Sequence, residues 1–140
     1  MADLSAFLSQ NKIKQENMKF VASKSFIDEN GNPMEWEIRA LSTSESDAIK
    51  KECTRRVKIK GNQYTMETDT DAYVGKLAAA CTVFPNLNDA ALQNSYGVMG
   101  GDNLLKAMLS VGEYTAYTNK ISEINGFDVA MDDIVEEAKN

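Results

Sequence analysis

Histidine is absent from the 140 residues of this sequence. Catalytic systems that pair a Ser or Cys nucleophile with His are therefore excluded, as are metal centres with imidazole ligands. Two carboxylate pairs could still serve as acid and base, Asp69 with Asp71 and Asp132 with Asp133. Carboxylates so placed more commonly cap helices or occupy a first helical turn, where the helix dipole favours them. We therefore expect a non-enzymatic protein without a catalytic site.

Cysteine is scarce as well. The sequence has two, Cys53 and Cys81, on separate predicted helices. Their spacing fits neither a zinc-ligand pattern nor a secreted disulfide framework, and free Cys is often buried. We expect reduced, buried thiols, and no metal or cofactor.

Long hydrophobic runs are also missing, since nowhere do 18 apolar residues follow one another. The first residues, "MADLSAFLSQNK", lack the basic start and the long apolar stretch of a secretory signal. We therefore expect a cytosolic protein that does not enter a membrane.

The composition that remains is that of an ordinary globular protein, with 43% apolar and 26% charged residues. A chain of this length predicts a single domain over residues 1–140. Its charge is uneven: residues 1–64 contain 11 Lys and Arg against 9 Asp and Glu, whereas residues 65–140 contain 4 against 12. The acidic half argues against binding to nucleic acid, which needs clustered cations.

Two further stretches invite functional interpretations. The cationic run "KKECTRRVKIK", residues 50–60, contains no aromatic residue on which bases could stack. We interpret it as a solvated helix face and ribbon edge, with an acidic protein partner as the alternative. The stretch "YGVMGGDN" lacks the Gly-Lys-Ser/Thr ending of a phosphate-binding loop, so it more simply joins two helices.

The N-terminal part predicts a β-hairpin, with strands over residues 18–27 and 34–40. Asn30 and Gly31 lie between the strands and tolerate the backbone angles of tight hairpin turns. In the second strand apolar and charged residues alternate, with Met34, Trp36 and Ile38 on one face. Because a lone two-stranded hairpin is marginal in water, helices must cover this face, and Trp36 is the expected anchor.

The rest of the chain predicts mainly helices over residues 43–138. Apolar spacing and cap residues predict helices over 43–55 and 70–83, then shorter ones around 88–97, 104–109, 114–126 and 128–138. Ser42 and Glu45 fit a capping box, and Asn88 is a candidate N-cap. Residues 55–70 predict a loop or a small β-ribbon. The expected fold class is α+β, mostly helical, with one small antiparallel β element near the N-terminus.

The N-terminal segment places apolar side chains at i, i+3 and i+4, namely Leu4, Phe7 and Leu8. This spacing predicts a short helix over residues 3–10 with one apolar edge. Isolated helices of this length are marginal in water. Residues 1–17 therefore predict a flexible arm that becomes ordered by packing on something else, and these three side chains are the candidate partner-binding residues.

The full sequence resembles a known family in four stretches: "LSAFLSQNK" at 4–12, "FIDENGNPMEWEIRALS" at 26–42, "AAACTVFPNLNDAALQNSYGVMG" at 78–100 and "LLKAMLSVGEYTAYTNKISEINGF" at 104–127. Together they resemble the XkdN-like phage tail assembly chaperones of phages and defective prophages of Gram-positive bacteria. The resemblance implies a helper that binds the long, helical tape measure protein before the tail tube polymerises around it.

The resemblance carries further expectations. A frameshifted longer form would recruit tail tube subunits, and the protein would act in the host bacterial cytoplasm and be absent from the mature virion. Self-association along the client is left open. The alternative is a structural tail component, such as a tail-completion or adaptor protein.

Overall fold

The computed structural model describes residues 4–127. Two 3-10 turns, η1 (Leu4–Phe7) and η2 (Ser9–Asn11), begin this part of the chain. The strands are β1 (Met18–Phe20), β2 (Trp36–Ile38), β3 (Thr54–Lys60), β4 (Gln63–Thr68) and β5 (Thr82–Phe84). The helices are α1 (Thr43–Glu52), α2 (Thr70–Cys81), α3 (Ala90–Tyr96), α4 (Gly101–Met108) and α5 (Val111–Ile124). The predicted mixed α+β fold is thereby confirmed, while the helix predicted over 128–138 lies outside the described residues.

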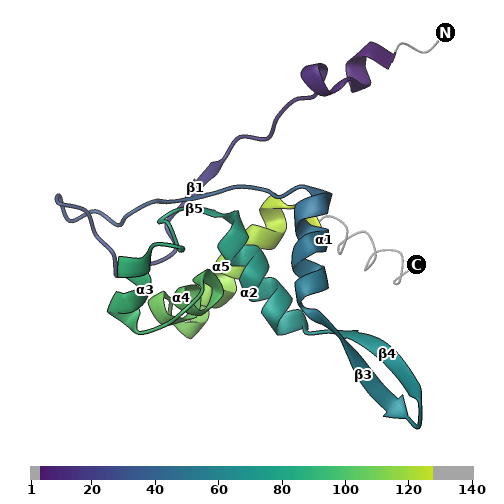
Figure 1. The fold of residues 1–140 in the computed structure, drawn as a ribbon. Helices are drawn as coiled ribbons and strands as arrows, with labels where there is room; N and C mark the ends of the chain where they lie inside the picture. Colours follow the sequence, from purple (N-terminus) through teal and green to yellow (C-terminus); the bar gives the residue numbers. More distant parts are fainter. Residues whose placement is uncertain (1–3, 128–140) are drawn as a thin grey trace, which may run out of the picture.

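The strands β1, β2 and β5 form an antiparallel sheet in that order (Figure 1). In β1 and β2, Met18 faces Ile38 and Phe20 faces Trp36, so the predicted antiparallel pairing is confirmed. The predicted strand lengths are wrong, because each of the two strands has three residues.

The predicted tight turn exists further along the connection between β1 and β2. The Met34 amide donates to the Phe26 carbonyl at 2.7 Å, and a single bridge joins Ile27 to Pro33. Gly31 has φ +82°, a conformation that glycine adopts at no steric cost. The amides of Asn30 and Asn32 donate to the Asp28 side chain and not to an opposite strand. Side-chain hydrogen bonds of this kind are typical of turns.

The third strand, β5, was not predicted. Thr82 and Val83 lie within the helix predicted over 70–83, but α2 ends at Cys81. Thr82 and Val83 are β-branched and Phe84 is aromatic, so all three residues suit a strand. The Arg39 amide donates to the Cys81 carbonyl at 2.8 Å, which ties the end of α2 to the end of β2.

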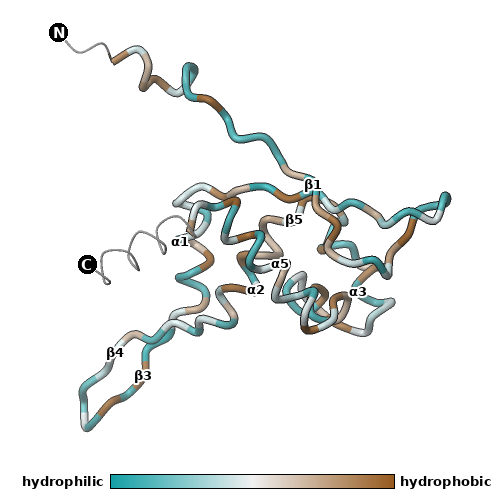
Figure 2. The backbone as a smooth tube through the Cα atoms, turned by 180° about the vertical axis from the view of Figure 1, so that it is seen from behind, coloured by the Kyte–Doolittle hydropathy of each residue, from teal (hydrophilic) through white to brown (hydrophobic). Residues whose placement is uncertain are grey.

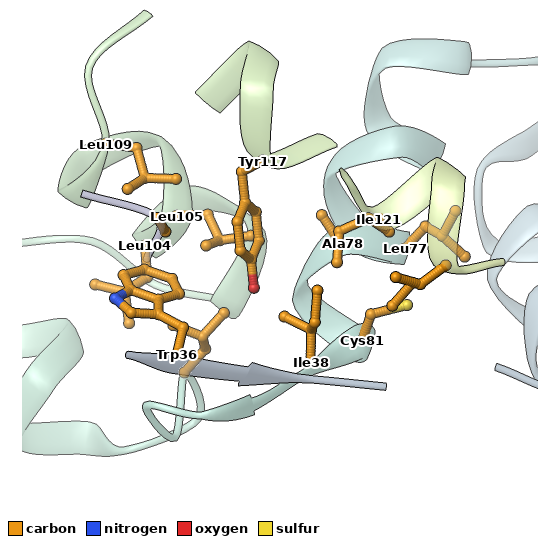
Figure 3. Packing of buried hydrophobic residues seen from close by; sticks show 13 residues of the cluster. Trp36, Ile38, Leu77, Ala78, Cys81, Leu104, Leu105, Leu109, Tyr117 and Ile121 are labelled. Atoms are coloured by element: carbon orange, nitrogen blue, oxygen red, sulfur yellow. The ribbon is translucent and has the colours of Figure 1, made fainter. Parts of the chain in front are cut away.

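The core lies where β2 meets the helices. Helix α2 packs against α1, α4 and α5. Trp36 and Ile38 point from β2 into this space, and the Trp36 ring meets the Tyr117 ring edge-on at 5.3 Å between centroids (Figure 3). Trp36 is 2% exposed, which confirms that it anchors the sheet to the helices. The other buried apolar residues of this cluster are Ala22, Leu77, Ala78, Cys81, Leu87, Leu104, Leu105, Leu109, Ile121 and Ile124.

Helix ends follow local chemistry closely. The predicted capping box is present at α1, where Ser42 and Glu45 exchange side chain–backbone hydrogen bonds of 3.1 and 3.2 Å. An equivalent box at α5 pairs Ser110 with Glu113. The predicted N-cap Asn88 is wrong: Asp89 caps α3 by accepting from the Leu92 amide at 2.8 Å. Asp89 directly precedes Ala90, the first residue of α3, so its carboxylate occupies the N-cap position.

Candidate partner-binding surfaces

The described residues offer no evident catalytic or metal centre. Within residues 4–127 no group of three or more His, Cys, Asp or Glu side chains could hold a metal ion. Asp69 caps α2 by accepting from the Ala72 amide at 3.1 Å, and Asp71 lies in the first turn of the same helix. This is the capping role expected for the pair, while Asp132 and Asp133 lie outside the described residues. None of the described helices is long and apolar enough to span a membrane.

The glycine-rich stretch joins two helices, as predicted. Gly97 is the left-handed C-cap residue of α3, with φ +67°, and Gly100 precedes the first residue of α4 with φ +91°. The cysteines are both free and buried. Burial raises the pKa of the Cys81 thiol above its usual value, so this group stays protonated within the core.

The N-terminal arm, residues 4–17, extends away from the body of the molecule (Figure 1). Leu4, Phe7 and Leu8 are 69%, 81% and 46% exposed. Figure 2 shows apolar segments along the part of the arm that lies far from the helices. The structure therefore leaves the three predicted partner-binding residues exposed within one segment.

The arm is not the continuous helix that its apolar spacing predicts. Leu8 has an extended conformation, with ψ 146°, and separates the two 3-10 turns η1 and η2. A hydrogen bond of 2.7 Å from the Asn11 side-chain amide to the Ser5 carbonyl spans the break. With no core surface to pack on, so short a segment cannot offset the cost of helix nucleation. Nearer the body, the Gln15 side-chain amide donates to the Ile124 carbonyl at 3.1 Å.

A second exposed element is the ribbon of β3 and β4, which projects from the body on the side of α1 (Figure 1). Its base is joined to the helices: the Asp69 amide donates to the Cys53 carbonyl, and the Thr54 hydroxyl to the Lys50 carbonyl. Gly61, with φ +57°, lies in the turn at its tip. The predicted ribbon is thereby confirmed over residues 54–68.

One face of the ribbon combines cations with apolar side chains. The register pairs Arg56 with Met66 and Lys58 with Tyr64, so these four side chains share a face. The Arg56 guanidinium lies 3.9 Å from the centroid of the Tyr64 ring. Met66 is 66% exposed, and an open hollow is lined by Arg56, Tyr64 and Met66 together with Asn62 of the turn and Thr65 of β4.

Sequence reasoning missed this face because the cationic run itself lacks an aromatic residue. Tyr64 follows the run by four positions, after the turn, and returns beside it only when the ribbon forms. The signal was present in the Gly61-Asn62 turn, since a tight hairpin at that point sets the register of both strands.

The geometry thus defines a small α+β protein whose conspicuous features are exposed arms around a helical core. Comparisons with known proteins agree with that class. The family described as phage XkdN-like tail assembly chaperone protein matches residues 4–139. The chain therefore belongs to the XkdN-like family of phage tail assembly chaperones.

Relatives of this chain occur in Bacillus subtilis strain 168. The chain is 35% identical to the uncharacterized protein YqbN over 139 residues, which cover 99% of this chain and 93% of YqbN. It is 33% identical to the phage-like element PBSX protein XkdN, covering 99% of this chain and 94% of XkdN. The crystal structure of YqbN matches with a TM-score of 0.77 at 31% identity, covering 90% of this chain and 98% of that one.

Proposed function

We propose that this protein binds the tape measure protein during phage tail assembly and helps to recruit tail tube subunits. It acts without catalysis in the cytoplasm of the host bacterium and is left out of the mature virion. Membership of the tail assembly chaperone family supports the general role. The relation to XkdN, a protein of a phage-like element, supports a prophage setting.

The observation that carries the proposal is the exposed apolar arm. Leu4 and Phe7 stay 69% and 81% exposed although both are large and apolar. Burying such a side chain against a partner contributes about 1.5–3 kcal/mol relative to leaving it in water. A partner therefore gains more from the arm than from most of the polar surface.

The spacing of the arm residues suits a helical client. Leu4, Phe7 and Leu8 fall on one edge when residues 4–8 wind as an α-helix. Amphipathic helices are recognised through anchors at i, i+3 and i+4. Contact with a helical client would supply the apolar surface whose absence leaves the arm as two 3-10 turns.

The test is co-expression with the tape measure protein of the same phage or prophage, followed by pull-down and a solubility assay. The parent is expected to keep the tape measure protein soluble and to co-purify with it. The variant Leu4→Ser/Phe7→Ser/Leu8→Ser is expected to lose at least about tenfold in captured client, since three anchors are removed.

A matched control removes apolar side chains of similar exposure from the body. Met99 and Val111 are 85% and 87% exposed, so Met99→Ser/Val111→Ser should leave client capture unchanged. Equal loss in both variants would reject the arm as the contact. Failure of the parent to solubilise or bind the client would reject client binding itself. Detection of this protein in purified particles by mass spectrometry would instead favour a structural tail component.

A further inference from the structure

The ribbon of β3 and β4 is a strongly cationic part of the described chain. It contains Arg55, Arg56, Lys58 and Lys60 against the single carboxylate of Glu67. The whole chain has a net charge of −6, so the remainder carries −9. The ribbon is thus a local positive site that projects from an acidic protein.

Its cations are not neutralised within the described residues. The ion pairs found among residues 4–127 join Arg39 to Glu45, Lys76 to Glu52 and Lys120 to Glu123. Arg55 faces Glu67 across the two strands, yet the two make no ion pair. Cations that only stabilised the fold would be expected to lie nearer to the abundant carboxylates.

The ribbon also exposes apolar side chains that contribute nothing to the core. Ile59, Tyr64 and Met66 are 64%, 45% and 66% exposed. Tyr64 and Met66 share a face with Arg56 and Lys58, around the open hollow near the turn. An occupant of this face meets two cations and two apolar side chains at once.

We infer that this face of the ribbon, formed by Arg56, Lys58, Tyr64 and Met66, is a docking surface for an acidic protein segment that carries apolar residues among its carboxylates. The carboxylates lie against Arg56 and Lys58, and the apolar side chains lie against Tyr64 and Met66. Charge complementarity to the unpaired cations identifies the occupant. The surface is separate from the N-terminal arm, so the inference does not depend on what the arm binds.

Nucleic acid fits the same face less well. Tyr64 is the one aromatic residue of the ribbon, and the Arg56 guanidinium already lies over its ring. Successive bases would find no further stacking platform. A long polyanion would also extend beyond the ribbon, and the rest of the chain has a net charge of −9, whereas a short acidic segment would stay on the ribbon.

The test uses the full chain and a fluorescein-labelled peptide in which Glu alternates with Leu and Thr. A matched peptide with Lys in place of each Glu and a single-stranded oligothymidine serve as comparison probes. Fluorescence anisotropy at low salt is expected to show binding of the Glu peptide, loss of that binding as salt rises, and no binding of the Lys peptide. Absence of Glu-peptide binding, equal binding of the Lys peptide, or tighter binding of oligothymidine would each overturn the inference.

Variants localise the site. Arg56→Glu/Lys58→Glu is expected to weaken Glu-peptide binding roughly tenfold or more. The control Lys12→Glu/Lys14→Glu makes the same change in net charge on the exposed arm and should bind as the parent does. Equal loss in the control would mean that net charge, and not the ribbon, governs binding.

A measurement on the unmodified chain covers the case in which the ribbon variant misfolds. Adding the Glu peptide should shift the backbone amide NMR signals of residues 54–68 and leave those of α4 and α5 unchanged. Shifts confined to residues outside the ribbon would overturn the assignment. The arm variant Leu4→Ser/Phe7→Ser/Leu8→Ser should bind the Glu peptide as the parent does, which separates this result from client binding.

Discussion

The two β elements within residues 4–127 have strands in which apolar and polar residues alternate, but their surroundings are opposite. In the three-stranded sheet, Trp36 and Ile38 of β2 are buried under the helices. In the ribbon, no residue of β4 is buried, and Ile59, near the end of β3, is mostly exposed. The difference shows that alternation predicts a strand, whereas burial depends on which helices pack against it. The covered sheet belongs to the folding core, and the bare ribbon is available for binding.

The largest expected effect comes from a substitution in the three-stranded sheet that the helices cover. Trp36→Ala should lower the free energy of unfolding by roughly 3–5 kcal/mol, because it leaves a cavity beside Tyr117 in the core. Chemical denaturation followed by circular dichroism gives the value. An unchanged unfolding free energy would mean that the sheet is not anchored by this residue.

A smaller effect on stability is expected from the ion pair between Arg39, which follows β2, and Glu45 in the first turn of α1. Arg39 donates to Glu45 at 2.8 Å, and this hydrogen bond, with help from the Ser42 backbone, lowers the pKa of Glu45 to about 2 from an ordinary 4.5. Since the folded pKa is the lower one, the carboxylate stabilises the fold above the unfolded value. That contribution is lost as the pH falls from about 4.5 toward about 2.

Glu45→Gln should therefore remove part of the acid dependence of stability. Melting temperatures measured between about pH 7 and about pH 3 should fall less steeply in this variant than in the parent. Glu67→Gln is the matched control, because Glu67 faces Arg55 in the ribbon but makes no ion pair with it. If both variants changed the acid dependence equally, the Arg39 contact would not be its cause.

The smallest expected effect comes from a substitution in the exposed ribbon of β3 and β4. Tyr64→Ala removes an aromatic ring from a strand, as Trp36→Ala does, but the ring is 45% exposed. We expect a change of at most about 0.5 kcal/mol in the free energy of unfolding, because no core surface is lost. A loss comparable to that of Trp36→Ala would place the ribbon within the folding core.

Several features of the fold were predictable because they depend on neighbours in the sequence. The capping box of Ser42 and Glu45, the left-handed Gly97 and the ribbon around Gly61 all follow from short-range chemistry. The end of α2 was harder. Thr82 follows a helix of regular apolar spacing although its β-branched side chain suits a strand, and pairing with β2 decides that it begins β5.

Of the two candidate surfaces, the N-terminal arm was predictable in part and the ribbon face was not. The exposed apolar residues Leu4, Phe7 and Leu8 were predictable, since a short apolar segment followed by polar residues has nothing nearby to pack on. Their conformation was not predictable, because a helix of that length needs a surface that lies elsewhere. The ribbon face was missed because Tyr64 and Arg56 meet only across a turn.

The sequence by itself thus determined the fold class, the capping box of α1, the buried Trp36 and the absence of histidine chemistry, because each depends on composition or on residues within a few positions. Only the tertiary structure decided that β5 joins β2 and that four residues of two strands form one cationic and apolar face. The physical reason is distance along the chain. Strand pairing and burial are set by contacts between distant segments, which local propensity does not encode.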